Sequence, residues 1–160
     1  MEKSRCTPQV TAEYRVAVTA LATNKENRRF LNDSCEHAKL LADLMIGCAQ
    51  NDDETVIYSG ELGKDCFENA LVSSQGKVRI LLDNKSGNEI INSLPENVKA
   101  RIEVRMIKHP CDEHFFVSGN SFRYETDHEE STAVANFNEP ETAIKLKALF
   151  NNMWDQAIGI

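Results

Sequence analysis

The residues best suited to chemistry lie on either side of Gly119-Asn120, a pair that is typical of a two-residue hairpin turn. If the two strands pair outward from this turn, Phe116 lies opposite Arg123 and His114 lies opposite Glu125. Residues that lie opposite each other on neighbouring strands share a face of the sheet. That face would carry His114, Phe116, Ser118, Ser121, Arg123 and Glu125. A histidine beside an arginine and a carboxylate could supply a nucleophile, a cation and an orienting group. The face is either a ligand pocket or dimer surface, or a solvated face with a His–Glu pair. The pattern leaves both readings open.

The alternate residues of the same hairpin predict where the core lies. Phe115, Val117, Phe122 and Tyr124 would share the opposite face. A face lined by such side chains is typical of one that packs against the protein interior.

The sequence gives little support for a metal site or a cofactor site. His109, Cys111 and His114 are close in sequence, but their spacing matches no common zinc pattern, so we predict no metal site. The chain has no glycine-rich phosphate loop, G-x-S-x-G or H-E-x-x-H motif, and we predict no cofactor.

Other polar residues are weaker candidates. Ser59 and Asp83 follow predicted parallel strands, where α/β folds bind ligands. His37 and His128 are interpreted as surface histidines. Their residue types alone do not indicate a function.

The elements that position these residues alternate along the chain. A helix ending near Gln50 is predicted behind Asn32-Asp33-Ser34, with Glu36 three residues after Asp33 as a possible capping box. Strands are predicted over 55–58, 77–82, 101–107, 113–118, 121–125 and 132–137. Further helices are predicted over 65–74, around 89–94 and from Pro140 onward.

This order predicts an α/β domain with a mixed sheet flanked by helices. Its N-terminal part would be parallel βαβ units and its C-terminal part an antiparallel hairpin. Residues 1–28 are interpreted as an N-terminal tail or variable segment and 29–160 as the domain. Within the first part, residues 14–21 could form a strand or a helix.

Composition narrows the class of protein. The 160 residues carry a formal net charge of −7, which disfavours nucleic-acid binding because such a surface repels phosphate. Five scattered cysteines and the lack of a long apolar run favour a cytoplasmic chain without a membrane span. Cys35 and Cys48 fall within an apolar helical pattern and are predicted to be buried thiols.

Two stretches together resemble one half of a phospholipase D-superfamily domain. The first runs from Glu36 through Val56-Ile57-Tyr58-Ser59 to Val78-Arg79-Ile80-Leu81-Leu82-Asp83. The second runs from His114-Phe115-Phe116-Val117 through Ala135-Asn136-Phe137 to Leu149-Phe150 and Trp154. Catalysis in that superfamily uses H-x-K-x-x-x-x-D, in which the histidine attacks phosphorus, the lysine binds phosphoryl oxygens and the aspartate supports the histidines. The resemblance brings Asn136 into the candidate site.

The chain departs from this motif at two of its three positions. With His114 at the histidine position, Phe116 is found in place of the lysine and Ser121 in place of the aspartate. Moving the frame to His109 places Cys111 and Phe116 there instead. Active members also bring two motifs together, through two halves or a homodimer, and this chain has room for one half.

The sequence therefore favours a non-catalytic phospholipase D-like binding or regulatory module that forms a homodimer near the face bearing Phe116. Its ligand-binding or interface residues would be His114, Phe116, Ser121, Arg123, Glu125 and Asn136. One alternative is a divergent phosphodiesterase or nuclease that uses His114 with Arg123 and Glu125. Another is a structural subunit with an unidentified protein partner.

Overall fold

The computed structural model describes residues 10–59, 64–83, 88–127 and 132–159. The helices are α1 (Ala12–Asn24), α2 (Cys35–Leu41), η1 (Ala42–Ile46), α3 (Lys64–Ser73), α4 (Asn88–Asn92), α5 (Glu96–Lys99) and α6 (Pro140–Trp154). The strands are β1 (Phe30–Asn32), β2 (Glu54–Ser59), β3 (Lys77–Leu82), β4 (Ile102–Met106), β5 (Phe115–Ser118), β6 (Ser121–Asp127), β7 (Thr132–Asn136) and β8 (Ile158–Gly159).

In the described ranges the strands form one eight-stranded sheet in the order β1-β7-β6-β5-β2-β3-β4-β8. Strands β2, β3 and β4 are parallel, whereas every other neighbouring pair is antiparallel. The predicted α/β class, with parallel βαβ units followed by an antiparallel hairpin, is confirmed.

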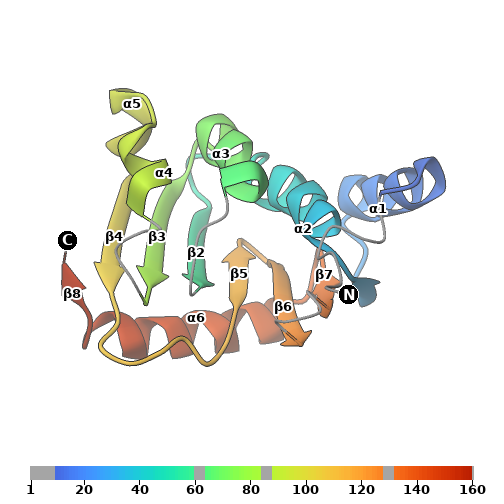
Figure 1. Cartoon of the computed structure of the whole chain (residues 1–160). Coiled ribbons are helices and arrows are strands. Elements are labelled where there is room, and N and C mark those ends of the chain that lie inside the picture. The colour runs from blue at the N-terminus through green and yellow to red at the C-terminus, as the bar shows by residue number, and fades with distance from the viewer. Residues whose placement is uncertain (1–9, 60–63, 84–87, 128–131, 160) are drawn as a thin grey trace, which may run out of the picture.

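Helices cover both faces of the sheet (Figure 1). Residues of α1 to α5 and η1 form one apolar cluster with Ile57, Ile80 and Phe116. Residues of α6 form a second cluster with Phe115, Val117 and Phe122. Because neighbouring residues of β5 point to opposite sides, the two clusters lie on opposite faces of the sheet.

The hairpin register is confirmed at every predicted pair. Phe116 lies opposite Arg123, and Ser118 lies opposite Ser121, across the Gly119-Asn120 turn. Gly119 has a φ of 57°, a left-handed conformation that glycine adopts at little cost.

The first predicted domain helix differs from expectation in three ways. The N-cap is Ser34, whose hydroxyl accepts from the His37 backbone N–H, so the predicted Asp33–Glu36 box is wrong by one residue. The α-helix also gives way to a π-helical segment at Ala42, where the Gly47 N–H reaches back to the Ala42 carbonyl. Cys48, beyond that segment, is exposed rather than buried, and the Cys35 side chain lies outside the described part.

His37 is buried, which corrects its assignment to the surface. Its ring stacks on Tyr14 with centroids 4.0 Å apart, and its Nδ1 accepts from the Asp33 backbone N–H at 3.1 Å. His128 lies outside the described residues.

Residues 12–24 form a helix, which decides the open choice between strand and helix. Val18 of α1 is buried in the first apolar cluster, and the Tyr14 hydroxyl donates to the Leu31 carbonyl at 2.9 Å. The boundary at residue 28 stays a prediction. Within the described ranges, no helix combines the length and apolar composition that crossing a bilayer requires.

Candidate functional site

His114 directly precedes β5, at the edge of the sheet where β2 and β3 end. Its Nδ1 lies 3.4 Å from the Ser59 Oγ at the end of β2 and 3.9 Å from the Cys111 Sγ. The Glu125 backbone N–H donates to the His114 carbonyl at 2.9 Å, so the hairpin register extends to this pair. Strand ends converge here, as predicted for Ser59 and Asp83.

The loop before His114 is fixed to the end of β3. The Asp83 carboxylate accepts from the Cys111 backbone N–H at 3.0 Å, and the Cys111 thiol donates to the Glu113 carbonyl at 2.8 Å. Burial raises the pKa of the Cys111 thiol to about 12. Cys111 is therefore a neutral thiol beside the imidazole, and it is a poor nucleophile at neutral pH.

Two tyrosines hold the acidic residues of the same loop. The Tyr58 hydroxyl donates to Asp112 and the Tyr124 hydroxyl donates to Glu113, each at 2.8 Å. Burial, followed by these hydrogen bonds, raises the pKa of Tyr58 and raises that of Tyr124 to about 12. The phenols thus stay protonated donors, and carboxylates predominate around the loop.

Phe116, which the sequence resemblance aligns with the lysine of the phospholipase D motif, is a core residue. It is 3% exposed, and its ring meets that of Phe67 in α3 edge-on, with centroids 5.8 Å apart and planes at 83°. This corrects the expectation that a partner subunit would bury Phe116, because its own chain already does so.

Arg123 is directed toward β1. Its Nε donates to the Asn32 Oδ1 at 2.5 Å, and its Nη1 lies 3.7 Å from the Glu125 Oε2. Arg123 is 5% exposed, and burial lowers the pKa of its guanidinium while Glu125 opposes that effect. The interpretation of this face as solvated is wrong, since Phe116, Ser118 and Arg123 are all buried.

Ser121 and Asn136 lie away from His114. The Ser121 hydroxyl donates to the Phe137 carbonyl at 2.9 Å beside the turn, at the far end of the hairpin. Asn136 pairs with Phe122 and therefore lies on the α6 face. The six candidate residues do not form a single site, and whether each contacts a ligand stays a prediction.

Asn136 instead fixes the chain between α1 and β1. Its Oδ1 accepts from the backbone N–H groups of Arg28 and Asn138, at 3.0 and 3.1 Å. Its Nδ2 donates to Asn27 and to Glu139, each at 2.9 Å.

The sequence did not predict the residues that Cys111 and Arg123 contact, although one of these contacts could have been expected. The contact of Cys111 with Asp83 could have been found, because the 109–114 segment and the end of β3 converge at one sheet edge. The bond between Arg123 and Asn32 joins residues 91 positions apart and has no local signal. His109 is exposed, and among the described residues no group of three potential ligands could hold a metal ion.

Comparison with known proteins places the fold. No protein-family model and no curated protein matches the sequence. Among solved structures, Nuc from Salmonella typhimurium, a phospholipase D family member, superimposes with a TM-score of 0.59 at 20% identity over 84% of this chain and 99% of that one. NucT from Helicobacter pylori gives a TM-score of 0.62 at 11% identity over 84% and 100%.

TrmBL2, an archaeal chromatin protein with a novel mode of DNA binding, gives a TM-score of 0.61 at 17% identity over 92% of this chain. The chain spans 61% of the length of that protein. Together these matches show that the chain has the phospholipase D fold.

Proposed function

We propose that this phospholipase D fold serves as a non-catalytic binding or regulatory module that pairs as a homodimer. The observation that carries the proposal is the packing of Phe116 against Phe67. An aromatic ring, covered by α3, stands where the superfamily motif has a phosphate-binding lysine. A phosphoryl group bound there would lack the fixed cation that stabilises its transition state.

Arg123 supports the same proposal. It is directly opposite Phe116 and is the candidate for a replacement cation. Its guanidinium already contacts Asn32 and Glu125, and it is buried. Recruiting it to phosphate would break these contacts and remove the donor to the buried Asn32 Oδ1, which costs about 1–3 kcal/mol. A divergent phosphodiesterase is therefore the less favoured proposal.

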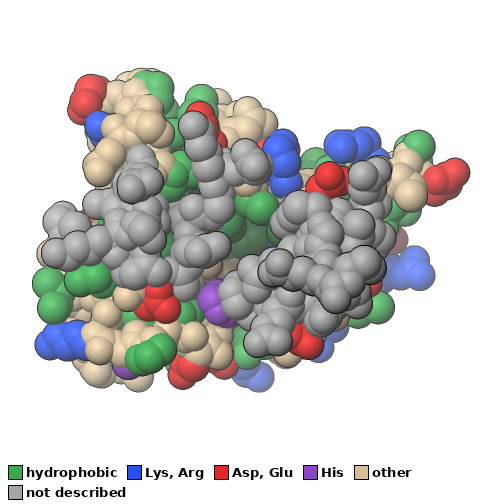
Figure 2. Space-filling model, viewed as in Figure 1, with side chains coloured by type: hydrophobic (Ala, Val, Ile, Leu, Met, Phe, Trp, Pro, Cys, Tyr) green, Lys and Arg blue, Asp and Glu red, His purple; other side chains and the backbone are tan. Residues whose placement is uncertain are grey.

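Nucleic-acid binding is a second candidate because the fold is similar to that of a DNA-binding chromatin protein. On the face in Figure 2 the basic side chains are scattered rather than gathered in one patch. Elsewhere Arg79 bonds to Glu54 and lies over the Phe150 ring, while Arg105 lies over the Trp154 ring at 4.4 Å. With the net charge of −7, these engagements favour a partner other than a phosphate backbone.

The homodimer proposal rests on the superfamily's use of paired half-domains and on the frequency of isologous dimers. Light scattering should give twice the chain mass of 18.0 kDa over a range of concentrations. A mass that stays at one chain throughout would rule out the pairing.

Turnover assays test the non-catalytic proposal. Wild type, His114→Ala and the matched control His109→Ala would be purified identically and assayed with aryl phosphodiesters, phospholipids, DNA and RNA. We expect no hydrolysis above that of His114→Ala. Hydrolysis lost in His114→Ala but kept in His109→Ala would establish the phosphodiesterase alternative.

A further inference from the structure

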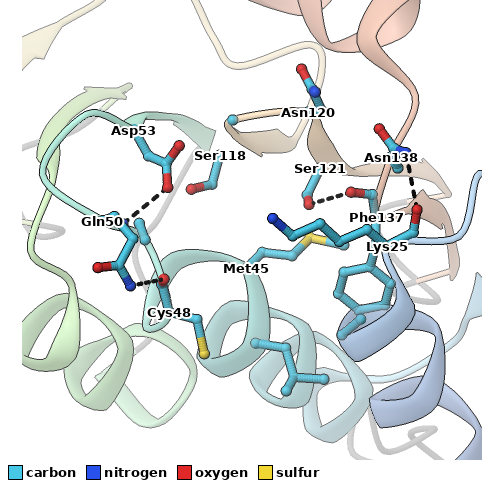
Figure 3. A pocket seen from close by; sticks show the side chains of 14 residues that line it. Lys25, Met45, Cys48, Gln50, Asp53, Ser118, Asn120, Ser121, Phe137 and Asn138 are labelled. Carbon is cyan, nitrogen blue, oxygen red and sulfur yellow. Dashed lines mark hydrogen bonds between the residues drawn. The ribbon is translucent and has the colours of Figure 1, made fainter.

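A pocket lies beside the hairpin turn, at the far end of β5 from His114 (Figure 3). It has a volume of about 470 Å³, within the range of small-molecule sites. The turn between β5 and β6 forms one wall, and the chain from η1 to Asp53 forms another. Lys25, after α1, and Phe137-Asn138, after β7, complete it.

One part of the pocket is apolar. Met45 and Phe137 are nearly buried and belong to the first apolar cluster, and Ala22 and Leu44 pack against it. A ligand with a hydrocarbon group could cover these side chains and gain free energy from the apolar area removed from water.

Lys25 supplies a positive charge. Its backbone is fixed in a left-handed conformation with a φ of 48°, its N–H donates to the Ala22 carbonyl and its own carbonyl accepts from Asn138. In Figure 3 its side chain extends across Met45 toward the middle of the pocket. Within the described chain, the Lys25 ammonium forms no ion pair, so it remains available to an anion.

Asp53 supplies a negative charge from the opposite wall (Figure 3). Its Oδ2 accepts from the Gln50 backbone N–H at 2.9 Å, which orients the carboxylate. Its Oδ1 lies 3.3 Å from the position that a Cβ at Gly119 would take, so the carboxylate rests against the turn.

Ser118 adds a buried hydroxyl to the same pocket. It is 5% exposed, lines the pocket, and accepts from the Thr55 hydroxyl at 3.0 Å. Having accepted that bond, the Ser118 oxygen retains its own proton to donate.

We infer that this pocket binds a small zwitterion with an apolar group, of the free α-amino acid class. The ligand carboxylate would accept from Lys25 and Ser118, its ammonium would donate to Asp53, and its side chain would cover Met45 and Phe137. Opposite charges on facing walls favour a molecule that carries both a positive and a negative group. A ligand with only one charged group would leave the charge on one wall without a partner. The inference does not depend on whether His114 is catalytic.

Calorimetric titration with L-leucine tests the inference, with two analogues as selectivity probes. Leucine methyl ester lacks the carboxylate charge, and 4-methylpentanoate lacks the ammonium group. We expect saturable leucine binding and at least about tenfold weaker binding of both analogues, since each loses charge-assisted hydrogen bonds. No leucine binding at millimolar concentration, or equal binding of either analogue, would overturn the inference.

Two variants test whether leucine binds in this pocket. Lys25→Met keeps the length of the side chain and should weaken leucine binding at least about tenfold. Lys145→Met, which changes an exposed lysine of α6, is the matched control and should bind as wild type. Unchanged binding in a folded Lys25→Met protein would overturn the assignment.

Cys48 offers a second readout that does not depend on a variant. Cys48 is exposed and is one of the residues that line the pocket, whereas the partly buried Cys66 lies outside the lining. Leucine should slow the alkylation of Cys48 relative to Cys66, as followed by peptide mass spectrometry. Equal rates with and without leucine would contradict binding at this place.

Discussion

The Phe116 ring lies edge-on against the Phe67 ring, with the two ring centroids 5.8 Å apart. The pair joins β5 to α3 and belongs to the apolar cluster that fills one face of the sheet. At this position, which the proposed alignment with the phospholipase D motif gives to a lysine, Phe116 makes a core contact. Stability, rather than catalysis, is therefore what a change at Phe116 should affect first.

Phe116→Ala should lower the free energy of unfolding by about 3–5 kcal/mol, because it removes a buried ring and leaves a cavity. Urea denaturation measures this change. Val16→Ala, at a position that is 70% exposed on α1, is the control and should shift stability by no more than about 0.5 kcal/mol. A Phe116→Ala protein as stable as the control would mean that the ring is not packed as described.

Asn136→Ala should lower the free energy of unfolding by at least about 2 kcal/mol, because the buried Asn136 amide makes four hydrogen bonds that the variant loses. Asn152→Ala, at an exposed position of α6, is the matched control. Urea denaturation of both variants compares the two. Equal stability would show that water replaces the Asn136 side chain at little cost.

The Glu139 carboxylate should make stability depend on acidity. The hydrogen bond from Arg29, supported by Thr142 and Asn136, lowers the pKa of Glu139 from 4.5 to about 2. A lowered folded-state pKa adds stability above the unfolded value, and this contribution is lost as pH falls from near 4.5 toward 2.

Glu139→Gln should therefore lose less stability than wild type when urea denaturation is repeated from pH 7 down to about pH 3. Glu141→Gln, an exposed neighbour in the first turn of α6, should retain the wild-type acid dependence. The same slope in wild type and Glu139→Gln would refute the assigned coupling to Arg29.

Cys48 should react with iodoacetamide much faster than Cys111 at pH 8. Cys48 is exposed, whereas burial raises the pKa of Cys111 to about 12 and leaves little thiolate. Mass spectrometry of the two peptides over time gives both rates. Comparable rates would contradict the burial of the Cys111 thiol.

The local sequence pattern was sufficient to predict the turn of the hairpin and the pairing of its strands. Gly119-Asn120 indicated the turn, and alternation placed Phe116 opposite Arg123. These are contacts between residues close in sequence, whose geometry the turn and the pleat determine. The parallel strands were predicted for a similar reason, since apolar runs such as β3 are typical of a sheet covered on both sides.

Contacts between residues far apart in the sequence could not be predicted from the local pattern. Nothing near Arg123 indicates that Asn32 binds its guanidinium, and nothing near Phe116 indicates that Phe67 covers it. A polar residue on an alternating strand was therefore interpreted as facing solvent or a ligand, although it is buried. The burial of His37 follows from its stacking on Tyr14 in α1, a helix whose weak periodicity left its type undecided.

The proposed absence of catalysis requires that no phosphoryl group binds beside His114. Two-dimensional NMR of the histidine side chains, recorded while tungstate is added as a phosphate analogue, tests it at the residue concerned. The His114 imidazole signals should stay in place up to millimolar tungstate, as should those of the exposed His109. A saturable shift of the His114 signals alone, absent from Arg123→Lys, would contradict the account and show that Arg123 replaces the missing lysine.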